Sequence, residues 1–336
     1  MPAPLIDPKA LAKETRNVLG LDHEPELRFL ARGEYSLNYL TTSTPEPLVI
    51  RCVTGSQIGL SLVEQVRYEA RALRLLAPSG RTPRWIATQP EPEGLPFPFL
   101  VETWLPGSPL DYATGLEEAA RCVAAIHRLP VAREHGLLLY GEPGPAIVAE
   151  AREWAASYLG WNEGPRALRA ALQRAFAAVE ADLERASSVF AEPDLAYVNY
   201  DLNTHNFIVR PDDGFVSLID WEKARVAPAT QDLAHFLLPT TTLWRTATAT
   251  RLTPDQETRF IDAYLAARPH LEGERLLIQL ASMKRLIALR AVAWCSWAVV
   301  TSATGNRAIS NEETIERSRA YLDPEFLHAL FAPASP

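Results

Sequence analysis

Two short runs of β-forming residues, Phe207–Arg210 and Phe215–Ile219, are separated by Pro-Asp-Asp-Gly, and this pattern predicts a β-hairpin. If Gly214 takes the left-handed conformation in a three-residue loop, counting back from the turn places Asn206 opposite Asp220. Directly opposed residues point to the same face of a hairpin, with Cβ atoms about 5 Å apart. The hairpin therefore predicts two oxygen-bearing side chains converging at its open end, and such hard ligands suit Mg²⁺.

Asp201 stands five residues before Asn206, on a loop that would enter the same end of the hairpin. It is placed to accept a proton from a hydroxyl nucleophile while Asn206 and Asp220 hold the metal on a nucleotide. Kinases divide the work in this way between one base and the metal ligands. The stretch therefore predicts a phosphoryl-transfer site with Asp201 as the catalytic base.

The spacing D-x-x-x-x-N, followed about a dozen residues later by an Asp in an apolar strand, resembles the protein-kinase-like fold. Within that fold, Ile219-Asp220-Trp221-Glu222 and Gln231-Asp232-Leu233-Ala234 resemble the aminoglycoside phosphotransferase and choline kinase superfamily. The resemblance covers roughly residues 28–238. It implies that Asp232 steadies the catalytic loop, which comprises residues 199–206.

Two positions in the catalytic loop depart from the family pattern. Asn199 stands where His is common, and Tyr200 stands where Gly is usual. That His mainly organises the loop, and Asn can still donate and accept hydrogen bonds. The departures therefore concern loop geometry more than chemistry.

The resemblance implies an α+β, two-lobed protein-kinase-like fold, with a small antiparallel β-sheet and one key helix in the N-terminal lobe and a larger, mainly helical C-terminal lobe. We expect the nucleotide-binding lobe at residues 1–101, a hinge at 102–107 and the helical lobe at 108–336. β-Forming runs predict strands at residues 28–31, 37–42, 48–53, 83–88 and 97–104. Apolar spacing and caps predict helices at residues 8–19, 61–77, 117–128, 147–159, 166–187, 230–238, 254–267, 274–304, 311–321 and 324–331.

Arg51 lies in the middle of an apolar strand, where a charge needs either solvent or a partner. On the helix predicted at 61–77, Glu69 falls on the apolar stripe, so its carboxylate points inward. Each group would be costly to bury alone, so the two are predicted to pair. The pair resembles the strand Lys and helix Glu that orient nucleotide phosphates in kinases, with Arg in place of Lys. The alternative is that Arg51 faces solvent and Glu69 pairs with Arg67 or Arg71.

The resemblance implies further nucleotide contacts. The first hairpin, with the single Gly33 in its turn, would cover the phosphates, and Ser36 would add a hydroxyl donor. An ordinary hairpin turn is the alternative for Ser36. At the end of the fifth strand, Glu102 and Trp104 would offer main-chain atoms to adenine.

Composition limits the possible partners. The chain of 336 residues has 33 basic and 41 acidic residues, a net charge of −8 and no basic run, which disfavours nucleic acid as the main partner. Cys52, Cys122 and Cys295 lack paired spacing and predict buried thiols in a reducing compartment. No signal peptide is predicted, and Arg290 interrupts the most apolar stretch, at 286–303. We therefore expect a cytoplasmic protein without a membrane partner.

Together these features predict a small-molecule kinase that uses ATP or GTP with Mg²⁺ and phosphorylates a hydroxyl of a small substrate; the acidic surface would suit a cationic one. The alternative is a nucleotide-binding pseudokinase that acts as a scaffold or sensor, motivated by Asn199, Arg51 and the single-glycine turn. A protein kinase ranks last, because the short connection from Asp220 to the helix at residue 230 leaves little room for an activation segment. The identity of the acceptor and the oligomeric state are left open.

Overall fold

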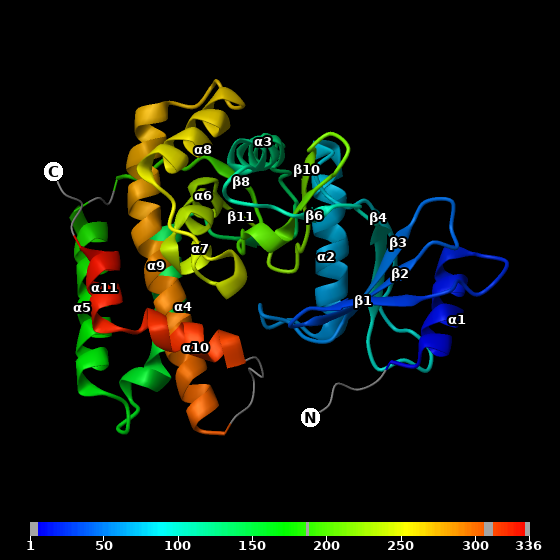
Figure 1. Ribbon diagram of the computed structural model, residues 1–336, viewed down its shortest axis with the longest axis horizontal. Coiled ribbons are helices and arrows are strands. Elements are labelled where there is room, and N and C mark those ends of the chain that lie inside the picture. Colours follow the sequence, from blue (N-terminus) through cyan, green and yellow to red (C-terminus); the bar gives the residue numbers. More distant parts are fainter. Residues whose placement is uncertain (1–5, 186–187, 306–311, 333–336) are drawn as a thin grey trace. The chain divides into compact units, whose positions relative to one another are not determined.

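The computed structural model describes residues 6–185, 188–305 and 312–332. Their helices and strands are drawn in Figure 1. The chain forms two compact units: residues 1–138 with 204–225, and residues 139–203 with 226–336. The predicted lobe boundaries, with a hinge at 102–107, stay a prediction.

A five-stranded antiparallel sheet dominates the first unit, with strand order β1-β2-β3-β5-β4. This confirms the five predicted strands and their antiparallel arrangement. The strands are β1 (Arg28–Arg32), β2 (Ser36–Thr41), β3 (Leu48–Val53), β4 (Trp85–Gln89) and β5 (Phe99–Thr103).

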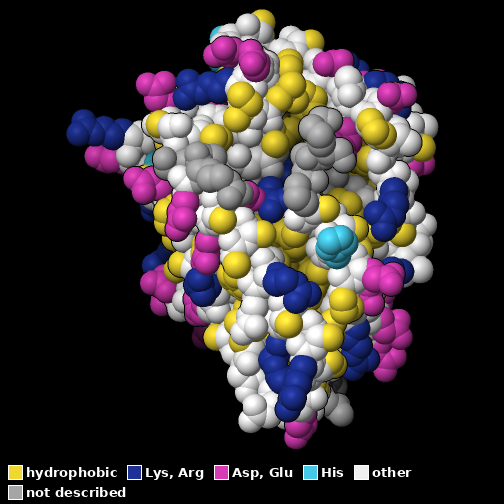
Figure 2. Space-filling view, turned by 90° about the vertical axis from the view of Figure 1, so that its left-hand side faces the viewer, with side chains coloured by type: hydrophobic (Ala, Val, Ile, Leu, Met, Phe, Trp, Pro, Cys, Tyr) yellow, Lys and Arg dark blue, Asp and Glu magenta, His cyan; other side chains and the backbone are white. Residues whose placement is uncertain are grey.

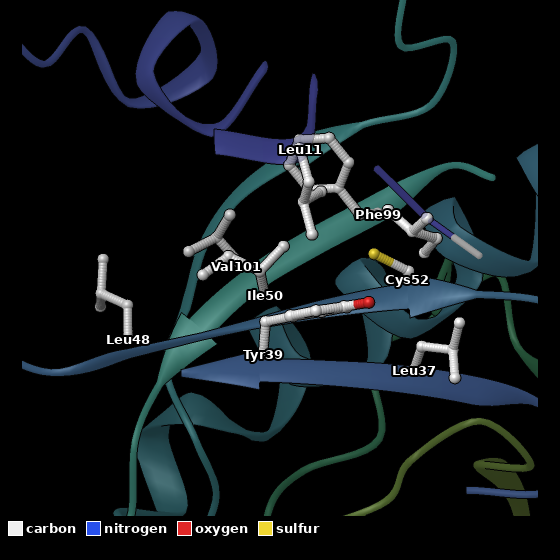
Figure 3. Packing of buried hydrophobic residues seen from close by; sticks show 9 residues of the cluster. Leu11, Leu37, Tyr39, Leu48, Ile50, Cys52, Phe99 and Val101 are labelled. Atoms are coloured by element: carbon white, nitrogen blue, oxygen red, sulfur yellow. The ribbon is translucent and has the colours of Figure 1, made fainter. Parts of the chain in front are cut away.

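One face of this sheet carries a hydrophobic core, shown in Figure 3. Leu48, Ile50 and Cys52 of β3 all belong to it, because alternate residues of a strand point to the same face. Leu11 reaches the same core from α1 (Pro8–Leu19), which begins at the predicted N-cap Asp7. Side chains between these positions on β3 must therefore point to the opposite face.

Helix α2 (Leu62–Leu76) supplies the inward-facing carboxylate predicted for this unit. Ser61 caps it in a capping box with Glu64, which satisfies free backbone donors at the helix start. Glu69 is buried with the apolar side chains of the helix, and the helix packs against β3, β4 and β5. The predicted helix and its N-cap are confirmed.

The hairpin that follows the catalytic loop consists of β9 (Phe207–Val209) and β10 (Val216–Leu218), and its register differs from the prediction by one residue. The backbone N–H of Arg210 donates to the carbonyl of Phe215 at 2.9 Å, so the loop has four residues, beginning with Pro211. A proline has no N–H to donate to a partner strand, so it is excluded from the ladder.

The shift in register corrects the predicted opposition of the two metal ligands. Asn206 lies opposite Ile219, whose N–H donates to the Asn206 carbonyl at 2.7 Å, and not opposite Asp220. Gly214 has φ 70°, the left-handed conformation that was predicted for it. The first unit also contains β6 (Ser108–Pro109), which extends the hairpin in the order β10-β9-β6, and α3 (Leu116–His127).

The second unit is mainly helical. Helix α9 (Gly273–Ala303) packs against α4 (Pro143–Leu159), α5 (Arg166–Arg185), α6 (Thr230–Leu237) and α10 (Glu312–Tyr321). The remaining helices are α7 (Pro239–Thr242), α8 (Pro254–Ala266) and α11 (Pro324–Phe331). A third sheet has the order β7-β11-β8, formed by β7 (Leu138–Leu139), β8 (Leu195–Val198) and β11 (Arg225–Pro228). The predicted helices are all present, apart from residues 186–187 and 311 of two predicted ends, which lie outside the described residues.

Helix α9 is the one helix among the described residues that is long and apolar enough to cross a membrane. Of its most apolar window, 67% is buried inside the protein. Burial against several other helices is the pattern of a core helix, and a core helix can be as long and apolar as a membrane-spanning one.

The structure confirms the prediction of buried thiols, and the face drawn in Figure 2 carries mixed charges. Cys52, Cys122 and Cys295 are all buried and free. On the face drawn in Figure 2, acidic and basic side chains lie interspersed among hydrophobic ones.

Candidate active site

Arg51 is the centre of an ion-pair cluster in the first unit. Its Nε lies 2.9 Å from Glu69 Oε2, and its Nη2 lies 2.7 Å from Asp220 Oδ1 and 3.1 Å from Glu222 Oε2. The guanidinium points to the α2 face because its neighbours Ile50 and Cys52 both face the core of Figure 3. The predicted contact with Glu69 is confirmed, and the alternative of a solvent-facing Arg51 is wrong, since its side chain is only 12% exposed.

Burial and crowding make the carboxylates of this cluster unusual. Burial raises the pKa of Glu69 against the lowering effect of Arg51, and burial together with Asp220 raises the pKa of Glu222 to about 8. Burial also raises the pKa of Glu102 to about 7. Burial alone would lower the pKa of Arg51, but its three carboxylate partners raise it well above the ordinary value, so it stays a cation. The site holds more carboxylate than one cation balances, which favours a second positive charge.

The two predicted metal ligands belong to this unit. Asp220 has φ 62° and a side chain that is 31% exposed, whereas Asn206 is largely buried at the end of the 3₁₀ turn Thr204–Asn206. In the described part of the chain, no group of three or more His, Cys, Asp and Glu side chains could hold a metal. Mg²⁺ needs no such cage, since it usually binds one or two protein oxygens together with water and substrate phosphates. A carboxylate, an amide oxygen and the excess of negative charge fit that ion.

Predicted nucleotide contacts also lie along the strands. Ser36 is buried on β2, and its Oγ accepts a hydrogen bond from Asn38 Nδ2 at 3.2 Å. Asn38 pairs with Arg51 across the sheet, so Ser36 and Asn38 point to the same face as the guanidinium. Glu102 lies inside β5, and the N–H of Trp104 donates to the carbonyl of Pro47 at 2.9 Å. The N–H of Trp104 is therefore already used by a contact within the first unit.

Asp201 belongs to the second unit, in a loop that is held by Asp232. The carboxylate of Asp232 accepts from the backbone N–H of Asn199 at 2.8 Å and of Tyr200 at 2.9 Å. Asn199 Oδ1 accepts from the N–H of Asp201 at 3.2 Å, so the Asn in place of the family's His still orders the loop. His235 Nε2 lies 3.6 Å from Asp201 Oδ1. The Asp201 side chain is 37% exposed, which leaves it accessible to a substrate.

Sequence reasoning did not identify several polar partners of these residues. Gln65, one turn before Glu69, donates from Nε2 to Glu69 Oε1 at 3.2 Å and to the carbonyl of Glu222 at 2.9 Å. The spacing of Gln65 and Glu69 on one helix face was the available signal. His235 stands three residues after Asp232 and therefore lies on the same face of α6. This spacing was also available in the sequence. Glu222, the third carboxylate on Arg51, stands two residues after Asp220, a spacing that places both on the same side of an extended chain.

Tryptophans gather on one side of α4 and α9. Trp154 packs against Trp297 with ring centroids 5.1 Å apart and against Trp294 at 6.3 Å, and Trp244 packs against Trp294 at 5.8 Å. All four side chains are half-buried, so they form a partly open aromatic cluster in the second unit.

Comparison with known proteins identifies a family model that matches most of this chain. The model of the phosphotransferase enzyme family matches residues 26–277 of this chain. Comparison with curated protein sequences gives no match.

Solved structures share the fold at low sequence identity. A spectinomycin phosphotransferase in complex with ADP and spectinomycin has a TM-score of 0.64 at 13% identity, covering 98% of each chain. An ethanolamine kinase of Plasmodium vivax has a TM-score of 0.66 at 11% identity, covering 94% of this chain and 86% of the other. A choline kinase of Cryptosporidium parvum has a TM-score of 0.60 at 14% identity, covering 97% and 98%. These matches confirm the predicted α+β kinase-like fold. By its match to the family model, the chain belongs to the phosphotransferase enzyme family and is an enzyme that transfers phosphoryl groups.

Proposed function

We propose that this phosphotransferase is a small-molecule kinase that moves the γ-phosphoryl group of ATP or GTP to a hydroxyl of a small acceptor. One observation supports the site above all others. Among the described residues, only Tyr200 and Asp220 have a positive φ without being glycine, at 70° and 62°. Tyr200 directly precedes the proposed base, and Asp220 is a proposed metal ligand. Backbone strain of this kind concentrates at functional sites.

In this proposal each residue has a defined task. Asp201 orients the acceptor hydroxyl and takes its proton as the oxygen attacks the γ-phosphorus. Arg51, held by Glu69, directs its guanidinium at the nucleotide phosphates, and a planar fork can contact phosphate and carboxylate together. The γ-phosphoryl bond to the leaving diphosphate breaks as the bond to the acceptor oxygen forms.

Asn206 and Asp220 would hold Mg²⁺, which when bound would neutralise negative charge on the phosphates. Ser36 would donate its hydroxyl to a phosphate, and the strand end at Glu102 and Trp104 would contact the base through main-chain atoms. In Trp104 the carbonyl would make this contact, because the N–H already donates to the carbonyl of Pro47.

The acceptor is proposed to be a small hydroxylated compound, with a cationic compound as the first choice. The related structures include kinases of choline, ethanolamine and spectinomycin by their names, and each of these compounds is a hydroxylated amine or ammonium. The partly open tryptophan cluster on α4 and α9 would accommodate such a group, since a cation is attracted to the face of an indole ring. The free, buried cysteines support placing the enzyme in the cytoplasm.

The test is nucleotide turnover on a panel of hydroxylated amines, amino acids, sugars and antibiotics, with Mg²⁺ and either ATP or GTP. Acceptor-dependent release of ADP or GDP is expected, and Asp201→Asn is expected to lower it by about 10² to 10⁴-fold. Asp212→Asn, the same change at an exposed position of the hairpin loop, is the control and should leave turnover unchanged.

Two outcomes would contradict the proposal in different ways. Undiminished turnover by Asp201→Asn would remove Asp201 from the role of base. Stabilisation by Mg²⁺ and nucleotide without turnover on any acceptor would favour the pseudokinase, because binding alone raises the unfolding temperature.

A further inference from the structure

Tyr200 occupies a backbone conformation that a bulky residue seldom adopts. Its φ is 70°, in the left-handed region, where an aromatic residue is a clear outlier and glycine is the ordinary occupant. The residue is nevertheless almost completely buried, at 1% exposure. Something in the surrounding structure must therefore hold it there.

The side chain of Tyr200 is held from three directions within the second unit. Its hydroxyl donates to Glu150 Oε2 on α4 at 2.7 Å, and the guanidinium of Arg290 on α9 lies 4.3 Å from the ring centre. Tyr140 packs edge-to-face against the ring, with centroids 5.8 Å apart. The backbone N–H of Tyr200 is bound by Asp232, so both ends of the residue are fixed.

Glu150 and Arg290 also hold each other. Arg290 Nε donates to Glu150 Oε1 at 3.1 Å, which leaves the other carboxylate oxygen for the Tyr200 hydroxyl. Both side chains are mostly buried, at 19% and 17% exposure, so the pair is protected from water. A hydrogen bond from a phenol to a carboxylate that is paired with a guanidinium is stronger than one between neutral groups.

We propose that Tyr200 is a positioning residue for Asp201, tied through Glu150 and Arg290 to helices α4 and α9. This inference rests on the proposed function, because it assumes that Asp201 is the base. Tyr200 precedes Asp201 directly, so the dihedral angles of Tyr200 set the direction in which Asp201 leaves the loop. A glycine at position 200 would allow the same conformation without holding it, whereas the tied tyrosine holds it.

The contacts of Tyr200 with Glu150 and Arg290 also connect the loop of Asp201 to the helices that carry the tryptophan cluster. Trp154 stands one turn after Glu150 on α4, and Trp294 stands one turn after Arg290 on α9. An acceptor resting on those indoles would contact the same two helices that hold Tyr200. The contacts of Tyr200 therefore position Asp201 relative to the acceptor, and not relative to the nucleotide.

The experiment compares the wild type with Tyr200→Phe and Tyr200→Gly. Tyr200→Phe removes only the hydroxyl that reaches Glu150 and is expected to lower kcat about tenfold, since a small misplacement of a catalytic group costs one to two orders of magnitude. The KM for the nucleotide is expected to stay within about twofold of the wild type. Tyr200→Gly is expected to lower kcat at least as far, although it relieves the backbone. Tyr158→Phe, which removes a hydroxyl from a buried tyrosine on α4, is the control for a general loss of stability.

Hydrogen exchange of the loop peptide gives a readout that does not depend on turnover. Exchange of the amides at 199–203 is expected to accelerate in Tyr200→Phe and to stay unchanged in Tyr158→Phe. A kcat equal to that of the wild type in Tyr200→Phe or Tyr200→Gly would overturn this inference. So would parallel changes in kcat and nucleotide KM that match those of Tyr158→Phe. Either result would leave the proposed function standing. Absence of turnover in the wild type would overturn the proposed function and this inference with it.

Discussion

Replacing Arg51 with methionine should destabilise the first unit strongly. Methionine keeps much of the length and flexibility of the side chain but removes its charge and donors. The change leaves Glu69, at 4% side-chain exposure, and Glu222, at 12%, without their cation. Asp220 is 31% exposed, so solvent screens part of its loss.

The expected magnitude follows from this burial. Removing one partner of a buried ion pair costs about 3–5 kcal/mol, because the remaining charge stays buried without compensation. At about 2–4 °C per kcal/mol for a folding unit of 150–250 residues, the unfolding temperature should fall by roughly 6–20 °C.

The loss should also depend on pH. Without Arg51, burial raises the pKa of Glu69 further, so the folded variant binds a proton that the unfolded chain releases above the ordinary pKa of Glu. The stability of the variant therefore falls as pH rises above about 4.5 and recovers as pH is lowered. The difference from the wild type should be smaller at pH 5 than at pH 8.

Urea unfolding at these two pH values measures the effect, with Arg84→Met as the matched control. Arg84 pairs with Glu46 on the surface, with side chains 61% and 51% exposed, so its replacement should cost at most about 1 kcal/mol. Adding Glu69→Gln to Arg51→Met should recover part of the loss, because it removes a carboxylate left without its partner. A cost for Arg51→Met no larger than that for Arg84→Met, and equal at both pH values, would refute the argument from burial.

Three further outcomes are expected. Asp232→Asn should lower stability by about 2–4 kcal/mol and speed amide exchange in the catalytic loop, because the two N–H groups bind different carboxylate oxygens and asparagine replaces one of these oxygens with a donor. Glu102→Gln should weaken the dependence of stability on pH between about 4.5 and 7; burial raises the pKa of Glu102 to about 7, so its contribution is present at low pH and is lost as pH rises through that range. Gly214→Ala should cost about 1 kcal/mol in urea unfolding, since φ is 70° there although the space around a Cβ is open. Equal urea midpoints for the wild type and Gly214→Ala would contradict the last of these.

Local patterns in the sequence determined most of the elements. Ser61 as an N-cap and Asp7 before a proline placed the starts of two helices, because free backbone donors at a helix start need an acceptor close in sequence. The pairing of Arg51 with Glu69 followed from two periods, two residues in a strand and 3.6 in a helix, that turned both charges toward the same buried layer.

Other features depend on contacts between segments that are far apart in sequence. The observed register of the hairpin differs from the predicted one by one residue, because Pro211 cannot enter the ladder. Asn206 therefore lies opposite Ile219 and not opposite Asp220. Since a shift of one residue turns every side chain of a strand to the other face, the residue types at the site were easier to predict than their relative placement.

Contacts between segments far apart in sequence form the environment of the proposed base. Asp232 lies 33 residues after Asn199, and Glu150 lies 50 residues before Tyr200, yet both bind the catalytic loop. The sequence identified Asp201 and the departures beside it, because a catalytic motif is local. The resemblance implied that Asp232 steadies this motif, and the hydrogen bonds of Asp232 confirm it. No local pattern showed that Glu150 and Arg290 hold Tyr200, because the free energy of those contacts comes from burying distant polar groups together.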